Sequence, residues 1–149
     1  MIWRVEIKEK KGIFDAAGRS VQKDIQDLGV VGVKKVEVSF VYLLYGNPDE
    51  AQVQKICTEL LADPIVQEYR FYRHSEEHSD EESNPEEILR FAQNDKKNLR
   101  IAEIAYHPGV MDPVEESTLK GIRDLGVKAI ESVSTARRYF LYGKISDRE

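Results

Sequence analysis

Two histidines near the middle of the chain offer the first candidate for chemistry. The segment His74-Ser75-Glu76-Glu77-His78 has the His-x-x-Glu-His spacing of one class of metallopeptidases. Such a centre requires a stable helix that presents both imidazoles, a third ligand and an enclosed pocket. The flanking residues are acidic, and the remaining histidine, His107, precedes a proline in a different segment. We therefore expect no metal site here, only adventitious metal capture by a loop of this composition.

Two further patterns are known from proteins that bind nucleic acids. Gly29-Val30-Val31-Gly32 has the spelling of the backbone clamp in KH domains, but it joins a predicted helix to a predicted strand without basic surroundings. Four tyrosines could stack bases, but the spacing of three within each pair places the two rings on opposite faces of a strand. We interpret them as packing residues: Tyr42, Tyr45, Tyr139 and Tyr142.

Two aspartates complete the candidates for chemistry. Asp15 and Asp112 each stand immediately before a predicted helix, where an aspartate side chain caps free backbone N–H groups. A cap explains both, so we do not assign them as catalytic acids. The sequence contains no Ser/His/Asp or Cys/His set and no glycine-rich loop for phosphate. We expect no catalytic and no cofactor-binding residue in this chain.

The composition is that of a globular protein with one unusual stretch. The net charge is −5, but residues 74–87 hold seven acids and no lysine or arginine; without them, 22 basic residues face 20 acidic ones. The remainder is nearly neutral, so we expect no nucleic-acid binding. The longest strong apolar run is about Val41–Tyr45, far short of a membrane span, so we expect no such span. The single Cys57 predicts a buried thiol, and the absence of a signal region at residue 1 predicts a cytoplasmic protein.

The strongest feature of the sequence is an internal repeat. Residues 6–46 align with residues 103–143 without a gap at a shift of 97 positions, and 16 of the 41 aligned pairs are identical. Gly32 corresponds to Ala129, so the KH-like pattern is not repeated. A unit of this size that occurs twice in one chain predicts a pseudo-dimer.

Each copy contains a helix with clear boundary signals. Asp15 and Asp112 are the predicted N-caps, and Gly29 and Gly126 end the two helices. In the second copy, Glu115 completes the spacing of a capping box with Asp112. The two copies reach the same boundaries with different residues, which strengthens the prediction of this helix.

The rest of the first copy completes a small domain. Alternating apolar and polar residues predict a strand over 2–8 and a long strand over 33–45. A helix is predicted over 49–62, and a last strand over 66–72. The order strand–helix–long strand–helix–strand predicts an α+β fold, a two-layer α/β sandwich of the ferredoxin-like kind.

The long strand becomes apolar on both faces towards its end. One face, which we expect to pack on the unit's own helices, carries Val36, Val38, Phe40, Tyr42 and Leu44. The opposite face also becomes apolar, and we expect a second sheet, that of the sister copy, to cover it. The predicted interface between repeats or with a partner consists of Val41, Leu43, Tyr45, Arg138, Phe140 and Tyr142.

We predict three segments along the chain. Residues 1–73 form the first unit, residues 74–98 a disordered acidic linker or insertion, and residues 99–149 the second unit. The insertion resembles translated repetitive DNA elements that interrupt reading frames in some bacteria. The second unit lacks its last helix and strand, so either the natural polypeptide continues beyond Glu149 or another chain covers the exposed sheet. We expect the former.

Several segments in order resemble one family. They are Ile13-Phe14-Asp15 and Ser20-Val21-Gln22 in the first helix, the long strand Val36–Tyr45, and Lys55–Ala62 leading to Glu68-Tyr69-Arg70. Together they resemble PurS, the small subunit of phosphoribosylformylglycinamidine synthase. Residues 105–143 resemble the PurS-like segment that opens certain fused forms of the large subunit, PurL. The resemblance covers about 115 of the 149 residues.

The resemblance implies a role in purine biosynthesis. The synthase is a ligase that uses ATP and glutamine to convert formylglycinamide ribonucleotide (FGAR) into the amidine (FGAM). A PurQ-like glutaminase releases ammonia, a PurL-like synthetase consumes it, and the PurS part, normally dimeric, bridges the two. ATP and magnesium belong to the synthetase, so this chain itself is expected to bind no cofactor and to hold no active site. It is then a tandem bridge that self-associates through its repeats, or the N-terminal piece of a larger synthase.

One alternative comes from a different functional class. Tandem ACT-like regulatory modules share the ferredoxin-like order of elements and bind amino acids between units. Stabilisation of the chain by one of the twenty amino acids would distinguish such a module from a bridge.

Overall fold

The computed structural model describes residues 2–74, 99–107 and 110–144. The strands are β1 (Ile2–Glu9), β2 (Val33–Gly46), β3 (Gln67–His74), β4 (Leu99–Ala105) and β5 (Ile130–Gly143). The helices are α1 (Ala16–Asp27), α2 (Glu50–Ile56), the π-helical turn η1 (Cys57–Leu61) and α4 (Pro113–Asp124). The predictions for His78 and for the acidic segment after His74 lie outside the described residues.

The capping aspartates begin α1 and α4 as the sequence predicts. The Asp15 carboxylate accepts from the Gly18 backbone N–H at 2.9 Å, and its other oxygen accepts from the Val38 N–H of β2 at 3.1 Å. Asp112 accepts from the Val114 N–H at 2.9 Å and from the hydroxyl of Thr135, the position equivalent to Val38. Each aspartate therefore starts its helix and also ties it to the long strand of its own half.

The predicted capping box at Glu115 is wrong. Asp112 instead accepts from the N–H of Val114, one residue earlier than a box requires, and its second oxygen accepts from the Thr135 hydroxyl. A capping box forms instead at α2, where the Asp49 carboxylate accepts from the Gln52 N–H at 2.7 Å and the Gln52 side chain accepts from the Asp49 N–H at 3.0 Å.

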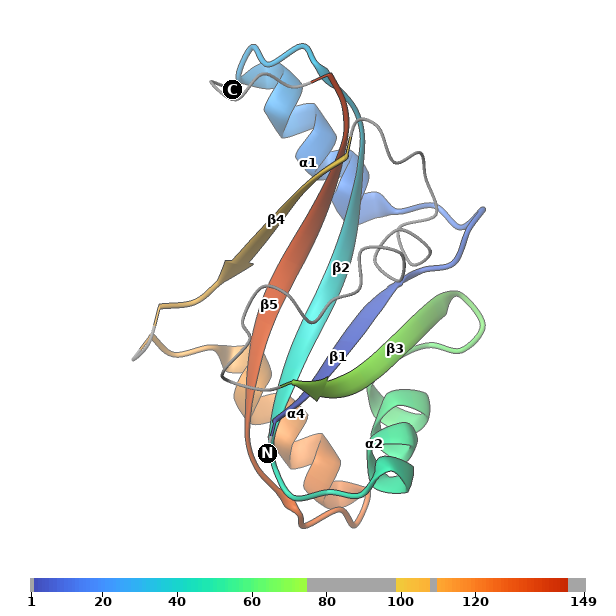
Figure 1. The fold of residues 1–149 in the computed structure, drawn as a ribbon, viewed down its shortest axis with the longest axis vertical. Helices are drawn as coiled ribbons and strands as arrows, with labels where there is room; N and C mark the ends of the chain where they lie inside the picture. The colour runs from blue at the N-terminus through green and yellow to red at the C-terminus, as the bar shows by residue number, and fades with distance from the viewer. Residues whose placement is uncertain (1, 75–98, 108–109, 145–149) are drawn as a thin grey trace.

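All five strands form one antiparallel sheet in the order β3-β1-β2-β5-β4. In Figure 1, α1 lies behind one end of the sheet and α4 behind the other, with α2 beside α4. The fold is therefore α+β with two layers, as predicted. Within the described residues, no helix is long and apolar enough to cross a membrane.

The pairing of β2 with β5 relates the two halves by an approximate twofold axis. Phe40 and Arg137 are equivalent positions of the repeat, and they lie directly opposite each other in the sheet. The Arg137 guanidinium lies 5.4 Å from the centre of the Phe40 ring. Pairs on either side of this point are also exchanged by the shift of 97, as Val38 with Tyr139 and Tyr42 with Thr135 show.

The prediction that the sister copy's sheet covers the second face is wrong. The two halves lie side by side, joined edge to edge through β2 and β5 (Figure 1). An edge strand presents a row of unpaired backbone N–H and C=O groups, and pairing the two long strands satisfies both rows at once. Hydrogen-bonded edges, rather than stacked faces, hold the halves together.

The helix-side core belongs to both halves. Val53 and Ile56 of α2 pack in one buried cluster with Ile122 of α4 and Val133 of β5. At the same contact, the Lys55 ammonium donates to the Leu125 carbonyl at 3.2 Å. Cys57 lies fully buried in this cluster, as predicted, and burial raises the pKa of its thiol to about 12. The halves therefore share a core.

Two glycines end the central strand pair, and replacing one of them is expected to destabilise the junction. Gly46 and its equivalent Gly143 have φ of +148° and +139°, and a Cβ on Gly46 would lie 2.1 Å from the Ala129 carbonyl oxygen. We expect Gly46→Ala to lower the free energy of unfolding by about 2–4 kcal/mol, because it adds a clash to backbone strain.

Chemical denaturation of the purified variants measures this effect. Gly29→Ala is the matched control, because Gly29 has φ +87° with open space around it and should lose only about 1–2 kcal/mol from strain. Equal losses in the two variants would show that the close approach at Gly46 is not formed.

Candidate functional site at the junction of the two halves

The six residues predicted as an interface all lie on the sheet face opposite the helices. Val41, Leu43 and Tyr45 project there from β2, and Arg138, Phe140 and Tyr142 from β5, whereas Tyr42 and Tyr139 pack on the helix side. Val41 and Phe140 are fully buried, and Leu43 and Tyr45 are half-buried. The alternation therefore identifies the face correctly.

The register does not bring the two apolar ends against each other. Leu43 and Tyr45 lie opposite Ser134 and Ser132, so these two apolar residues face serines. On the other side of the twofold axis, Phe140 and Tyr142 lie opposite Glu37 and Lys35. Among the six, Val41 and Arg138 lie nearest the axis. Leu43 and Tyr45 lie further along the strand pair on one side of it, and Phe140 and Tyr142 on the other side.

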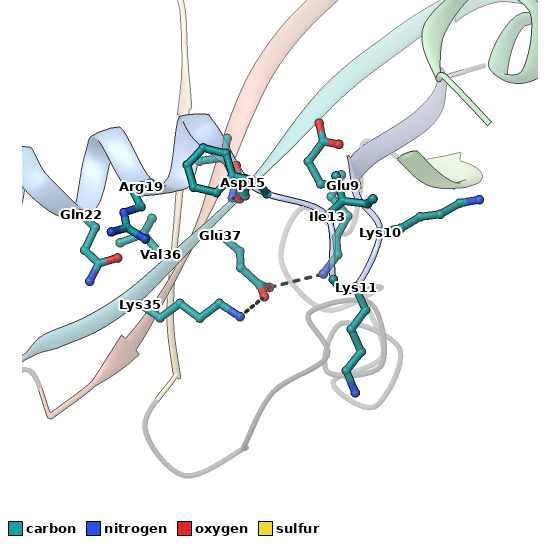
Figure 2. A pocket seen from close by; sticks show the side chains of 14 residues that line it. Glu9, Lys10, Lys11, Ile13, Asp15, Arg19, Gln22, Lys35, Val36 and Glu37 are labelled. Carbon is teal, nitrogen blue, oxygen red and sulfur yellow. Dashed lines mark hydrogen bonds and ion pairs between the residues drawn. The ribbon is translucent and has the colours of Figure 1, made fainter. Parts of the chain in front are cut away.

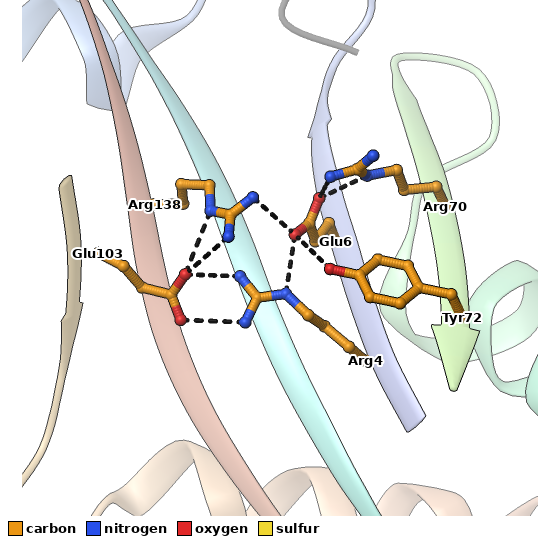
Figure 3. Close-up of polar contacts among 6 residues, drawn as sticks. All are labelled: Arg4, Glu6, Arg70, Tyr72, Glu103 and Arg138. Atoms are coloured by element: carbon orange, nitrogen blue, oxygen red, sulfur yellow. Dashed lines mark hydrogen bonds and ion pairs between the residues drawn. The ribbon is translucent and has the colours of Figure 1, made fainter. Parts of the chain in front are cut away.

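A network of charged residues, buried around Glu6 and partly exposed at Glu103, occupies the middle of this face. It draws Arg4 and Glu6 from β1, Arg70 and Tyr72 from β3, Arg138 from β5 and Glu103 from β4 (Figure 3). Glu6 has no exposed surface, and Arg4 is only 5% exposed. Four of the five strands thus contribute to one polar cluster over the central strand β2.

Each half contributes one equivalent carboxylate, and two arginines bridge the pair. Glu6 and Glu103 are related by the shift of 97. Arg4 donates to Glu6 at 2.8 Å and to both oxygens of Glu103 at 3.0 and 2.6 Å. Arg138 lies 3.2 Å from a Glu6 oxygen and 3.1 Å from a Glu103 oxygen. Arg70 adds a further ion pair to Glu6 at 2.5 Å. The network therefore connects the halves.

The charges in this network stabilise one another. Burial alone would raise the pKa of the Glu6 carboxyl, but Arg70, Arg138 and Arg4 outweigh it and hold that pKa below its ordinary value. The pKa of Glu103 is lowered in the same way, with Arg4 and Arg138 outweighing burial. Glu6 is therefore ionised at neutral pH and shielded from solvent. Glu6 therefore has no proton to donate at neutral pH, and its charge is compensated within a network that links the halves.

Sequence reasoning identified Arg138 but missed its partners. Arg4, Glu6 and Lys8 stand at the polar positions of the predicted strand 2–8, yet all three are buried. The sequence did contain a signal for this network. Three charged residues of alternating sign on one face of a strand can form ion pairs with neighbouring strands, which favours a paired arrangement over a solvent-exposed one. The partners Arg70 and Glu103 lie far away in sequence, and no local pattern points to them.

The remaining candidates for chemistry take structural positions. Asp15 and Asp112 cap helices, and Gly29 ends α1 in the left-handed conformation. Across residues 2–74, 99–107 and 110–144, no three His, Cys, Asp or Glu side chains gather as a metal site would require.

Comparison with known proteins decides the family. The family model described as PurS, phosphoribosylformylglycinamidine (FGAM) synthase, matches residues 2–75. The PurS subunit of Synechocystis sp. is 33% identical over 73 residues, which are 46% of this chain and 73% of that subunit. The PurS subunit of Methanocaldococcus jannaschii is 33% identical over 70 residues, covering 44% of this chain and 84% of the subunit. The chain belongs to the PurS family.

Further PurS proteins show the same extent of similarity. The PurS subunit of Archaeoglobus fulgidus is 32% identical over 74 residues, which cover 92% of its length. The crystal structure of M. jannaschii PurS superposes with a TM-score of 0.44 at 29% identity, over 48% of this chain and 92% of that one. PurS is a subunit of FGAM synthase, and the family match covers the first half of this chain.

Proposed function

We propose that the chain is a non-catalytic bridge in FGAM synthase, where it helps to couple a PurQ-like glutaminase to a PurL-like synthetase in the cytoplasm. The observation that supports this role is the family match, because the first half alone corresponds to 73–92% of the length of PurS subunits. In this proposal ATP and magnesium are bound by the synthetase, and the chain supplies no catalytic residue.

We further propose that the second half takes the place of a second PurS subunit. The repeat and the antiparallel pairing of β2 with β5 support a pseudo-dimer within one chain. The Arg4–Glu103 and Arg138–Glu6 ion pairs hold the halves in a fixed relative position. A bridge between two enzymes requires such rigidity, because the distance between the ammonia-releasing and ammonia-consuming sites must stay constant.

Reconstitution with the glutaminase and synthetase components of the same organism tests the proposal. FGAM formation is measured with either glutamine or ammonium salt as the nitrogen donor. We expect the glutamine-driven reaction to require this chain and the ammonium-driven reaction to proceed without it. A glutamine-driven rate that is the same with and without the chain would contradict the bridging role.

A variant on the proposed partner face sharpens this test. Leu43→Arg places a charge on the half-buried face opposite the helices, and we expect it to lower the glutamine-driven rate by about tenfold or more. Leu28→Arg is the matched control on the helix side, where Leu28 is 82% exposed. Circular dichroism verifies that both variants fold. Equal rates for the two variants would assign the partner contact to another surface.

A further inference from the structure

A cationic pocket in the first half has no cationic counterpart among the described residues of the second half. It is a cavity of about 290 Å³ between the loop after β1, the start of α1 and the early part of β2. Its basic lining residues are Lys8, Lys10, Lys11, Arg19 and Lys35, against three acidic ones, Glu9, Asp15 and Glu37. The lining therefore carries a formal excess of two positive charges, one of which is supplied by Lys10.

The three acidic side chains are engaged by the protein itself. Both oxygens of Asp15 accept backbone N–H groups, and Glu9 accepts from the Gln67 side chain at 3.2 Å. Glu37 lies 3.3 Å from the Lys8 ammonium and 3.1 Å from the Lys35 ammonium, and it also accepts from the Tyr142 hydroxyl. The carboxylates therefore do not turn the pocket into a site for cations.

The cations are arranged around the pocket at different depths. Lys8 is buried in the wall of the pocket, whereas Lys11 and Arg19 are exposed at its rim. Figure 2 shows the Lys35 side chain extending towards Glu37. Lys10 points to the Pro64 carbonyl, 2.6 Å away, and is not counted as a binding group. Burial lowers the pKa of the Lys8 ammonium, opposed by Glu37 and Glu68.

The repeat provides an internal control for what the fold needs. At the equivalent positions, Lys8 becomes Ala105, Arg19 becomes Glu116 and Lys35 becomes Ser132, while Asp15 is retained as Asp112. The second half builds the same strand, helix and capped turn without these cations. A cavity in the second half shares only four positions with the pocket, Ala105, Tyr106, Asp112 and Thr135, and its other lining residues include Phe40 and Arg137. The charged set is thus not a requirement of the local fold.

We propose that the first-half pocket binds a phosphate monoester of a pentose-sized molecule. Lysine ammonium groups and the arginine fork are the groups that recognise phosphate oxygens. The apolar side chains of Ile13, 40% exposed, and Phe14, 68% exposed, supply a wall for the uncharged part of such a ligand. The volume lies at the lower limit of small-molecule pockets, which suits a sugar phosphate better than a dinucleotide. This proposal does not depend on the bridging function.

Calorimetric titration of the full chain tests the proposal, with ribose 5-phosphate as the probe and inorganic phosphate and ribose as comparisons. We expect saturable binding of ribose 5-phosphate, weaker binding of inorganic phosphate and none of ribose. Absence of saturable ribose 5-phosphate binding would overturn the proposal. Equal affinity for inorganic phosphate would also overturn it, because the apolar wall would then contribute nothing.

A double variant locates the site. Arg19→Glu with Lys35→Ser introduces the residues found in the second half, and we expect it to weaken ribose 5-phosphate binding by about tenfold or more. The control, Lys23→Glu with Lys34→Ser, makes the same charge changes on the same two elements but outside the pocket lining. We expect it to change the affinity less than about twofold. Equal losses in the two variants would show a general effect of net charge and would overturn the assignment to this pocket.

Discussion

Replacing Glu6 with glutamine is expected to cost the protein about 3–5 kcal/mol of unfolding free energy at pH 7. Glu6 is fully buried and is held by Arg4, Arg70 and Arg138. The neutral amide keeps the shape of the side chain but leaves the buried guanidinium groups without their shared counter-charge. Urea denaturation of Glu6→Gln and wild type measures the difference.

The same variant is expected to alter the dependence of stability on pH. The pKa of Glu6 is lower in the folded chain than its ordinary value, so its stabilising contribution is complete above about pH 4.5 and is lost as the pH falls below that value. Wild type should therefore lose stability more steeply than Glu6→Gln between about pH 5 and pH 3. Glu103, whose pKa is also lowered, leaves some of this slope in the variant.

A surface glutamate provides the control for both measurements. Glu131 lies exposed on β5, and Glu131→Gln should change the unfolding free energy by no more than about 0.5 kcal/mol. Suppose that Glu6→Gln and Glu131→Gln had the same unfolding free energy at pH 7 and lost stability equally between about pH 5 and pH 3. The network around Glu6, and the link that it forms between the halves, would then be absent.

Ile122→Ala is expected to show that the two halves unfold together. Ile122 belongs to α4 of the second half, yet it is fully buried against Val53 and Ile56 of α2 in the first. Truncating a fully buried isoleucine to alanine costs about 2–5 kcal/mol through lost burial and the cavity left behind. We expect a single cooperative transition with this loss, because both halves contribute to one core.

Hydrogen exchange makes the prediction specific. In Ile122→Ala, the amides of β1 and α2 in the first half should lose as much protection as those of α4. Ile65→Ala is the matched control, since Ile65 is 80% exposed and should have little effect. Loss of protection confined to the second half would show that the halves unfold independently and that the shared core is not formed.

The local elements were predictable because their determinants lie within a few residues of each other. An aspartate before an apolar stripe and a glycine after it define α1 and α4, and the structure places Asp15, Asp112, Gly29 and Gly126 in these roles. The two-residue alternation of the long strand likewise separates the helix face from the opposite face. Helix 49–62 was less well predicted, since the structure ends α2 at Ile56 and continues as a π-helical turn.

The contacts between the halves were harder to predict from the sequence. The long strands end in residues that are apolar on both faces, so we expected a second sheet to stack on them and bury the face opposite the helices. The structure instead uses the unpaired edges of β2 and β5, and it places Glu37 and Lys35, not the sister strand's apolar end, opposite Phe140 and Tyr142. Side-chain pattern carries no information about which backbone edges will pair, so the correct face was predicted with the wrong partner.

The sequence by itself determined the repeated unit, the ends of its helices, the two faces of its long strand and the resemblance to PurS, because each depends on residue type at short spacing. Only the tertiary structure decided that the halves share one sheet and one core, and that Arg4, Glu6, Glu103 and Arg138 meet in a buried network. Those contacts join residues up to 132 positions apart, and their energy comes from burial and charge compensation that exist only once the strands have paired.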